Sequence, residues 1–99
     1  MIGLTRGVAL ETTGYNVTCN ALCPGTARTP VHEANLNQIA VRHKMAAADA
    51  ERTLLAGKQP TGRLIGPENV AALMVFLCGP HGADITGAVL PIDGGWSAA

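Results

Sequence analysis

The sequence predicts an α/β fold built on a parallel sheet. Helix-like and strand-like segments follow one another over the 99 residues in the order helix, strand, helical region, helix, strand. The first strand-like segment, residues 17–23, carries apolar side chains on both faces, which is typical of a parallel strand covered on both sides. The connection to the second strand is long enough to contain helices, as a parallel crossover requires.

The first segment, Met1–Thr13, has apolar residues at helical spacing, and Gly14 is a natural end for such a helix. No capping residue precedes the pattern, so we expect the chain to begin partway along a helix. Gly3 and Gly7 are poor helix formers, and their spacing predicts a face where another backbone comes close. The strand at residues 17–23 follows and is ended by Pro24 and the glycine after it.

A helical region of about residues 30–57 comes next and is predicted to form a flap. Thr29 can cap a helix at its N-terminus, and Pro30 suits the first helical position. The region closes on Gly57, and we expect two short helices with a break near Lys44–Ala46.

A third helix is predicted from Pro67, and its segment Val70–Cys78 is apolar all round. Such a helix needs burial on every side, and a 99-residue monomer offers too little protein to provide it. Gly79 and the proline after it end this helix, and Ala88–Ile92 forms the second strand. Two strands alone do not make a stable sheet, so residues 1–99 are expected to be part of a larger single domain.

Composition and charge exclude several classes of partner. Seven Lys and Arg balance seven Asp and Glu, which argues against a nucleic acid or an anionic membrane surface. Aromatic residues make up only 3% of the chain, too few for a platform on which single-stranded bases stack. The longest apolar run is too short to cross a bilayer, and no leader peptide is visible, so we expect a soluble, cytoplasmic protein.

The cysteines and histidines predict neither a disulfide framework nor a metal site. The three cysteines are an odd number, and Cys19 and Cys23 lie about 13 Å apart if the segment between them is extended. There is no Cys-x-x-Cys, and the three histidines are scattered along the chain. Buried, reduced thiols are the expectation.

A set of short motifs gives the sequence a family resemblance. In their order and spacing they resemble the C-terminal portion of the short-chain dehydrogenase/reductase family, over essentially the whole chain. The motifs are Asn20-Ala21-Leu22-Cys23-Pro24-Gly25, Thr29-Pro30, Gly62-Arg63, Pro67-Glu68-Asn69-Val70-Ala71, Phe76-Leu77, Ile85-Thr86-Gly87 and Asp93-Gly94-Gly95.

Within that family, three stretches look most like NAD-dependent D-3-hydroxybutyrate dehydrogenases. These stretches are Val8–Thr12, Lys58–Arg63 and the terminal Asp93–Trp96. The resemblance implies the C-terminal part of a doubly wound, parallel-sheet Rossmann fold, NAD as the cofactor and a small hydroxy acid as the substrate. It also implies a homo-oligomer that associates through the Val70–Cys78 helix and the last strand.

The residues that carry the family's chemistry are not found in this sequence. The family uses a Tyr that exchanges a proton with the substrate and a Lys four residues later that lowers the pKa of the phenol. The only tyrosine here is Tyr15, and Cys19 stands four residues after it. The spacing of Gly3, Gly7 and Ala9 is close to the family's dinucleotide motif, but no strand precedes it. No catalytic residue is therefore assigned, and the chain is not expected to be active alone.

The resemblance assigns cofactor contacts to the loop after the first strand. Pro24, Gly25, Ala27 and Thr29 match the family's loop beside the nicotinamide, where backbone groups near Ala27 would hold the carboxamide. The Thr29 hydroxyl would reach the carboxamide or a phosphate. A plain helix cap by Thr29 is the alternative, and both roles are compatible. NAD and NADP are not distinguished, because the residue that selects between them belongs to a part of the fold that does not match here.

Two residues are candidate substrate contacts by the same resemblance. Asn35 falls where hydroxybutyrate enzymes have a flap Gln for the substrate carboxylate, and Trp96 could supply an apolar wall or pack at a subunit contact. Thr26 stands where a Trp commonly lines the methyl pocket. We expect Arg63 to be an ion-pair partner and His32 an exposed helix residue.

Three interpretations of the whole chain remain open at this stage. The first is a segment of an NAD-dependent dehydrogenase acting on 3-hydroxy acids, with a 3-oxoacyl reductase as a variant. The second is a non-catalytic module that docks on intact dehydrogenase subunits. The third is an unfolded product of a truncated gene or a misplaced start, which the DNA sequence upstream of Met1 would reveal. Asn20 is expected to be a hydrogen-bonding residue at the end of a strand.

Overall fold

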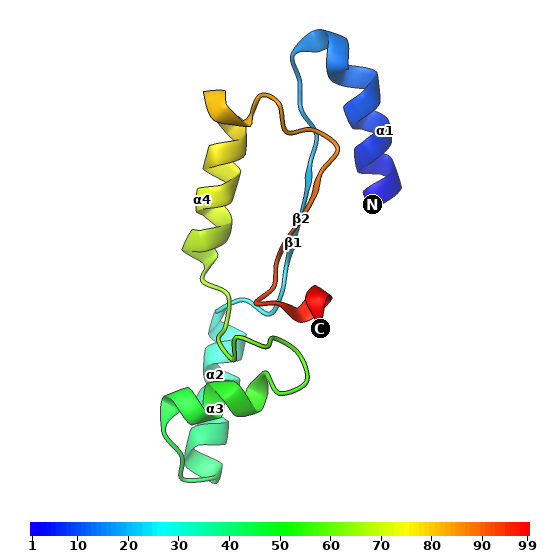
Figure 1. The fold of residues 1–99 in the computed structure, drawn as a ribbon. Helices are drawn as coiled ribbons and strands as arrows, with labels where there is room; N and C mark the ends of the chain where they lie inside the picture. Colours follow the sequence, from blue (N-terminus) through cyan, green and yellow to red (C-terminus); the bar gives the residue numbers. More distant parts are fainter. The chain divides into compact units, whose positions relative to one another are not determined.

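A computed structural model describes all 99 residues, and the chain divides into two compact units. Unit 1 comprises Met1–Cys23 with Glu68–Pro91, and unit 2 comprises Pro24–Pro67 with Ile92–Ala99. Each unit is described by itself. The elements, labelled as in Figure 1, are α1 (Ile2–Thr12), the 3-10 helix η1 (Thr13–Tyr15), β1 (Ala21–Pro24), α2 (Pro30–Arg42), α3 (Ala47–Leu54), α4 (Pro67–Cys78), η2 (Pro80–Gly82), β2 (Val89–Ile92) and η3 (Trp96–Ala98).

The first helix forms as predicted, but it ends differently. Gly14 lies inside η1, and the residue in the left-handed region that stops the helical path is Asn16, with φ of 57°. A methyl group built on Gly3 or Gly7 would meet no atom of the chain within 4 Å. The close backbone contact predicted at these glycines is therefore not made within residues 1–99.

The two strands form a two-stranded parallel sheet. The Ala21 N–H donates to the Ala88 carbonyl and, four residues further along each strand, the Gly25 N–H donates to the Ile92 carbonyl. The regular part of the first strand is shorter than the predicted residues 17–23, because the residues before Ala21 are extended without a continuous ladder. Asn20 is confirmed as a strand-end hydrogen-bonding residue. Its amide donates to the Ile85 carbonyl at 2.9 Å and accepts from the Ala88 N–H at 3.0 Å.

Helices lie on both sides of the strand pair in unit 1 (Figure 1). The side chains of Met74 and Leu77 from α4 face Leu22 of β1 across a shallow hollow, and α1 lies near Thr86 on the other side. This layering is that of the predicted fold, an α/β structure with helices on both faces of a parallel sheet.

Helix α4 has the bounds that its sequence predicted, but the rest of the chain does not bury its side chains. No residue of the helix is buried, and Met74, Val75 and Phe76 are 54%, 73% and 47% exposed. The expectation that 99 residues contain too little protein to bury this helix is confirmed. No helix is both long enough and apolar enough to cross a membrane. The three cysteines are free thiols, but the expected burial is wrong, since Cys19 and Cys23 are partly exposed and Cys78 is exposed.

Unit 2 contains the two helices expected between residues 30 and 57, and they pack on each other. The break between α2 and α3 falls where expected, and Lys44 adopts a left-handed conformation there with φ of 51°. The apolar core of the unit is a cluster of Leu36, Ala50, Leu55 and Leu64. Unit 2 therefore has a small hydrophobic core of its own.

Candidate functional site: the loop after β1

The loop Pro24–Thr29, which follows β1, is fixed along one edge by backbone hydrogen bonds. The Ile65 N–H donates to the Thr26 carbonyl at 2.9 Å, and the Arg28 N–H donates to the Ile65 carbonyl at 2.8 Å. These two bonds place Ala27 in a parallel bridge with Ile65. The N–H and carbonyl of Ala27 itself form no hydrogen bond within the chain. The loop thus presents one unpaired amide and one unpaired carbonyl, which a ligand with an amide group can pair.

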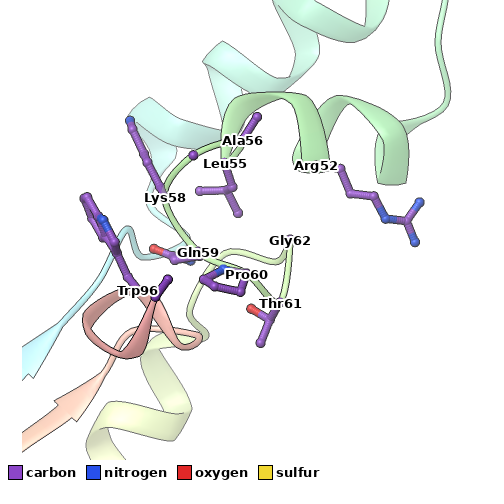
Figure 2. A pocket seen from close by; sticks show the side chains of 11 residues that line it. Arg52, Leu55, Ala56, Lys58, Gln59, Pro60, Thr61, Gly62 and Trp96 are labelled. Carbon is purple, nitrogen blue, oxygen red and sulfur yellow. The ribbon is translucent and has the colours of Figure 1, made fainter.

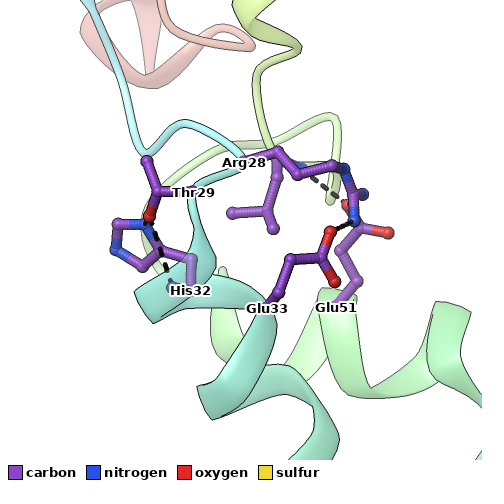
Figure 3. A network of polar contacts seen from close by, with 6 residues as sticks. Arg28, Thr29, His32, Glu33 and Glu51 are labelled. Atoms are coloured by element: carbon purple, nitrogen blue, oxygen red, sulfur yellow. Dashed lines mark hydrogen bonds and ion pairs between the residues drawn. The ribbon is translucent and has the colours of Figure 1, made fainter.

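Thr29 is the N-terminal cap of α2, as its sequence position predicted. The His32 N–H donates to the Thr29 hydroxyl at 3.3 Å, and the His32 ring nitrogen Nδ1 lies 2.9 Å from the same oxygen (Figure 3). The hydroxyl that caps the helix belongs to an exposed residue. His32 is partly exposed and takes part in this cap.

Arg28 joins the loop to the flap helices through two carboxylates. Its guanidinium pairs with Glu33 of α2 and, at 2.6 Å, with Glu51 of α3 (Figure 3). Glu51 also accepts the Leu64 N–H at 2.8 Å, and its side chain is only 15% exposed. The Glu33 pair is open to solvent and contributes little, while Glu51 connects three segments from a sheltered position. The sequence predicted Arg63 as the ion-pair partner. That prediction is wrong, because the ion pairs involve Arg28 and Arg52.

Gln59 is the buried polar residue of unit 2, with 3% of its surface exposed. Its side-chain oxygen accepts the Thr26 N–H, and its side-chain nitrogen donates to the Arg63 carbonyl at 2.7 Å. Both ends of the amide are therefore satisfied, as burial of a polar group demands. The side chain links the loop after β1 to the segment that precedes α4.

Two glycines allow this close packing. A methyl group on Gly25 would lie 2.7 Å from the Gln59 side-chain oxygen and 3.0 Å from the Asp93 Cα. Gly94 has φ of 61°, and its carbonyl accepts the Thr61 N–H at 3.1 Å. We call the meeting point of Pro24–Thr29, Lys58–Arg63 and Asp93–Trp96 the three-segment junction.

Asp93 holds the terminal turn that carries Trp96. Its carboxylate accepts the Ser97 N–H at 2.9 Å and the Gly95 N–H at 3.1 Å. Hydrogen bonds from Ser97 are the largest cause that holds the pKa of the Asp93 carboxyl below its ordinary value. The turn is thus ordered by an ionised carboxylate.

An open pocket of about 630 Å³ lies beside the junction, within unit 2. Its wall is the segment from Leu55 to Gly62, with Trp96 and Ala99 at one side. Figure 2 shows the Lys58 and Trp96 side chains on the same side of the loop, while Arg52 points away. The pocket is lined by the indole ring of Trp96 and by the cationic side chain of Lys58. Its volume falls in the range of small-molecule sites.

The remaining predicted residues lie elsewhere. Asn35 is exposed on α2 and is not among the residues that line this pocket. Tyr15 ends η1 and is 77% exposed. No group of three or more His, Cys, Asp or Glu side chains is placed to hold a metal ion.

Two residues of this site were not singled out in the sequence. Gln59 lies in the stretch Lys58–Arg63 that carries the family resemblance but has no predicted role, and Glu51 is one of several charged residues on an Ala-rich helix. The signal available in the sequence is the turn after Gln59, which Pro60 and Gly62 predict. Nothing in the sequence distinguishes Glu51 from its exposed neighbours.

Comparisons with known proteins agree on one family. The family described as Enoyl-(Acyl carrier protein) reductase matches residues 1–97. The chain is 37% identical over 98 residues to a D-beta-hydroxybutyrate dehydrogenase of Cupriavidus necator and, also at 37%, to that of Rhizobium meliloti. Each match covers 99% of this chain and 38% of the relative, so the chain spans less than half the length of these relatives.

Solved structures of similar fold include a member of the same family and two enzymes with a bound nicotinamide cofactor. A short-chain dehydrogenase family protein from Francisella tularensis is similar with a TM-score of 0.76 and 28% identity, over 99% of this chain and 40% of that one. A 4-hydroxyisoleucine dehydrogenase complexed with NADH has a TM-score of 0.78 at 26% identity, over 99% of this chain and 36% of that one. An actinorhodin polyketide ketoreductase with NADPH has a TM-score of 0.75 at 28% identity, over 99% of this chain and 37% of that one.

Proposed function

The chain belongs to the short-chain dehydrogenase/reductase family, and from that premise we propose that it forms the C-terminal part of an NAD-linked oxidoreductase. The proposed reaction interconverts a 3-hydroxy acid such as 3-hydroxybutyrate and the 3-oxo acid. Residues 1–99 would form part of a single domain. Within this part, the region of about residues 30–57 would form a flap. The assignment of the substrate draws on the 37% identity to the two D-beta-hydroxybutyrate dehydrogenases.

The observation that carries the proposal is the unpaired backbone of Ala27. Its N–H and carbonyl lie just beyond the carboxyl end of a parallel strand, where ligands bind in open α/β sheets. A nicotinamide carboxamide offers one acceptor and one donor, which complement these two groups. The bound nicotinamide would supply hydride transfer, and the residues of this chain would hold it in place. NADH and NADPH complexes both occur among the similar structures, so NAD is our choice to be tested against NADP.

The site residues have distinct proposed roles. Pro24 and Gly25 end β1 and start the loop, Ala27 holds the carboxamide, and the Thr29 hydroxyl contacts the carboxamide or a phosphate. Gly25 has to be glycine because the junction leaves no space for a methyl group there.

The proposed substrate contacts are Asn35 for the carboxylate and Trp96 for the apolar end. Trp96 is supported by its place at the side of the junction pocket. Asn35 has less support, since it is exposed on α2 away from that pocket.

A hybrid enzyme tests the proposal. The 98 residues of the Cupriavidus necator enzyme that align with this chain are replaced by it, and NADH formation from D-3-hydroxybutyrate is measured. We expect NAD-linked activity in the hybrid and none in the purified 99-residue chain, which carries no catalytic Tyr and Lys pair. Activity of the isolated chain would contradict the proposal.

Two substitutions in the hybrid test the assigned roles. Trp96→Ala should raise KM for the hydroxy acid and leave KM for NAD unchanged, whereas Thr29→Val should do the reverse. Preference of the hybrid for NADPH and a 3-oxoacyl thioester, against an NAD-linked parent enzyme, would favour a 3-oxoacyl reductase instead.

We also propose, as a second function of another kind, that α4 and β2 mediate association with dehydrogenase subunits, including further copies of the same protein. The exposed Met74, Val75 and Phe76 of α4 favour this role, because a soluble chain rarely leaves such a stripe uncovered. Co-purification of the tagged chain with an intact homologue would support it. A monomeric chain with a cooperative thermal transition would contradict it. Phe76→Lys should weaken the association, and Leu10→Lys on exposed α1 is the matched control.

A further inference from the structure

Gln59 holds the backbone of the cofactor loop, and nothing else holds the same point. The Thr26 N–H donates to the Gln59 side-chain oxygen, whereas the Thr26 carbonyl and the Arg28 N–H bond to Ile65. Beyond Gly25, whose N–H donates to the Ile92 carbonyl, the loop is therefore held by the backbone of Ile65 and by one side chain, that of Gln59. We propose that Gln59 is a positioning residue that holds Thr26 against the segment leading to Ile65, and thereby supports the bridge that presents Ala27 and the affinity of the loop for a nicotinamide cofactor.

The identity of the ligand in this inference rests on the proposed function. The anchoring of Thr26 by Gln59 does not depend on it. Without the Gln59 amide, the Gly25 N–H keeps its bond to the Ile92 carbonyl and the Ile65 bonds remain, while the Thr26 N–H loses its partner. The N–H and carbonyl of Ala27 belong to the two peptide groups that bond to Ile65, so they depend on where Ile65 lies relative to Thr26. Gln59 restrains that relation from both sides, because it accepts from the Thr26 N–H and donates to the Arg63 carbonyl, two residues before Ile65. The loss should affect cofactor binding more than the overall fold.

The chemistry of an amide explains why this residue is a glutamine. One end must accept a proton from the Thr26 N–H, and the other must donate one to the Arg63 carbonyl. A methionine of similar length does neither. An ionised glutamate accepts from Thr26 but faces the Arg63 carbonyl with a second acceptor, whereas a protonated glutamate accepts and donates as glutamine does.

This difference makes the Gln59→Glu variant a switch that pH operates. A carboxyl group at a site that is 3% exposed is expected to titrate above the usual value of about 4.3, because burial disfavours its charged form. Lowering the pH should therefore restore the glutamine-like pair of hydrogen bonds in one and the same folded protein. No other substitution at this position offers that test.

The experiment uses the hybrid enzyme with Gln59→Met and Gln59→Glu. The matched control is Gln38→Met, the same chemical change at an exposed position of α2. Amide hydrogen exchange of the peptide that covers residues 25–29 reports the Thr26 N–H, and steady-state kinetics report KM for NAD and kcat separately. In Gln59→Met we expect faster exchange and a KM for NAD about ten-fold higher, the scale of one buried hydrogen bond, with kcat changed less. Gln59→Glu should approach the unsubstituted hybrid as the pH falls.

Two results would overturn the inference. One is unchanged exchange of the 25–29 peptide in Gln59→Met, and the other is a Gln59→Glu variant whose KM for NAD follows the same pH profile as the unsubstituted hybrid. If Gln59→Met does not fold, the pH profile of Gln59→Glu decides alone. If the unsubstituted hybrid has no NAD-linked activity, the proposed function fails, while the exchange experiment still decides whether Gln59 anchors the loop.

Discussion

The two units of this chain use their apolar residues in opposite ways. Unit 2 surrounds Leu55, which is 1% exposed, with the other members of its core cluster. Unit 1 has apolar residues in plenty but leaves most of them in contact with water, among them Leu4 at 71% and Val75 at 73% exposed. Unit 2 thus encloses an apolar core, and unit 1 leaves apolar side chains exposed.

The comparison shows that apolar content alone does not identify a core. Helix α4 is among the most apolar segments of the sequence and buries no residue, while α3 is alanine-rich and polar and buries Ala50 completely. Burial follows from which elements a chain can bring together. The proposed function accounts for the difference, because in a larger oxidoreductase the rest of the sheet and further subunits would cover unit 1.

The largest expected difference between the units is in their response to losing a leucine side chain. Leu55→Ala removes the centre of the unit 2 core and should lower the free energy of unfolding by about 2–5 kcal/mol. Leu4→Ala is the same change on the exposed face of α1 and should alter it by less than about 0.5 kcal/mol. Urea unfolding followed by circular dichroism measures both. Similar losses for the two variants would contradict this difference in burial between the units.

Replacing a glycine with alanine should change the free energy of unfolding in opposite directions in the two units, and by different amounts. Gly25→Ala places a methyl group 3.0 Å from the Asp93 Cα and 2.7 Å from the Gln59 amide oxygen, so we expect a loss of about 1–3 kcal/mol from overpacking. Gly7→Ala lies within α1 with no atom within 4 Å, and we expect a gain of about 0.5–1 kcal/mol from helix propensity. The same unfolding curves test this pair. A destabilised Gly7→Ala variant would show that the predicted close contact at this glycine does form.

The sequence predicted the order and nearly all the bounds of the helices, because local signals determine them. Thr29 and Pro30 mark the start of α2 in any context, and a parallel sheet follows from apolar strands joined by a long helical connection. It predicted the loop after β1 as the site by resemblance. It could not predict that Gln59 and Glu51 hold this loop, because their partners are backbone groups brought close only by the fold. The backbone contact expected at Gly3 and Gly7 has the same explanation. The spacing of the two glycines allows another backbone to come close, but residues 1–99 place none there.

The smallest expected effect concerns the ionised carboxylate that orders the turn around Trp96. Hydrogen bonds from Ser97 lower the pKa of Asp93 in the folded chain relative to the unfolded one, so the carboxylate stabilises the fold at pH values above its ordinary pKa. That contribution should be lost as the pH falls from the ordinary value through the lowered one. Asp93→Asn, which cannot ionise, should flatten this part of the pH profile, while Asp84→Asn at an exposed position of unit 1 should leave it unchanged. Fluorescence of Trp96, the single tryptophan, reports the turn directly during acid titration. If Asp84→Asn flattened the profile and Asp93→Asn did not, the assignment of the acid-sensitive contact to the terminal turn of unit 2 would be wrong.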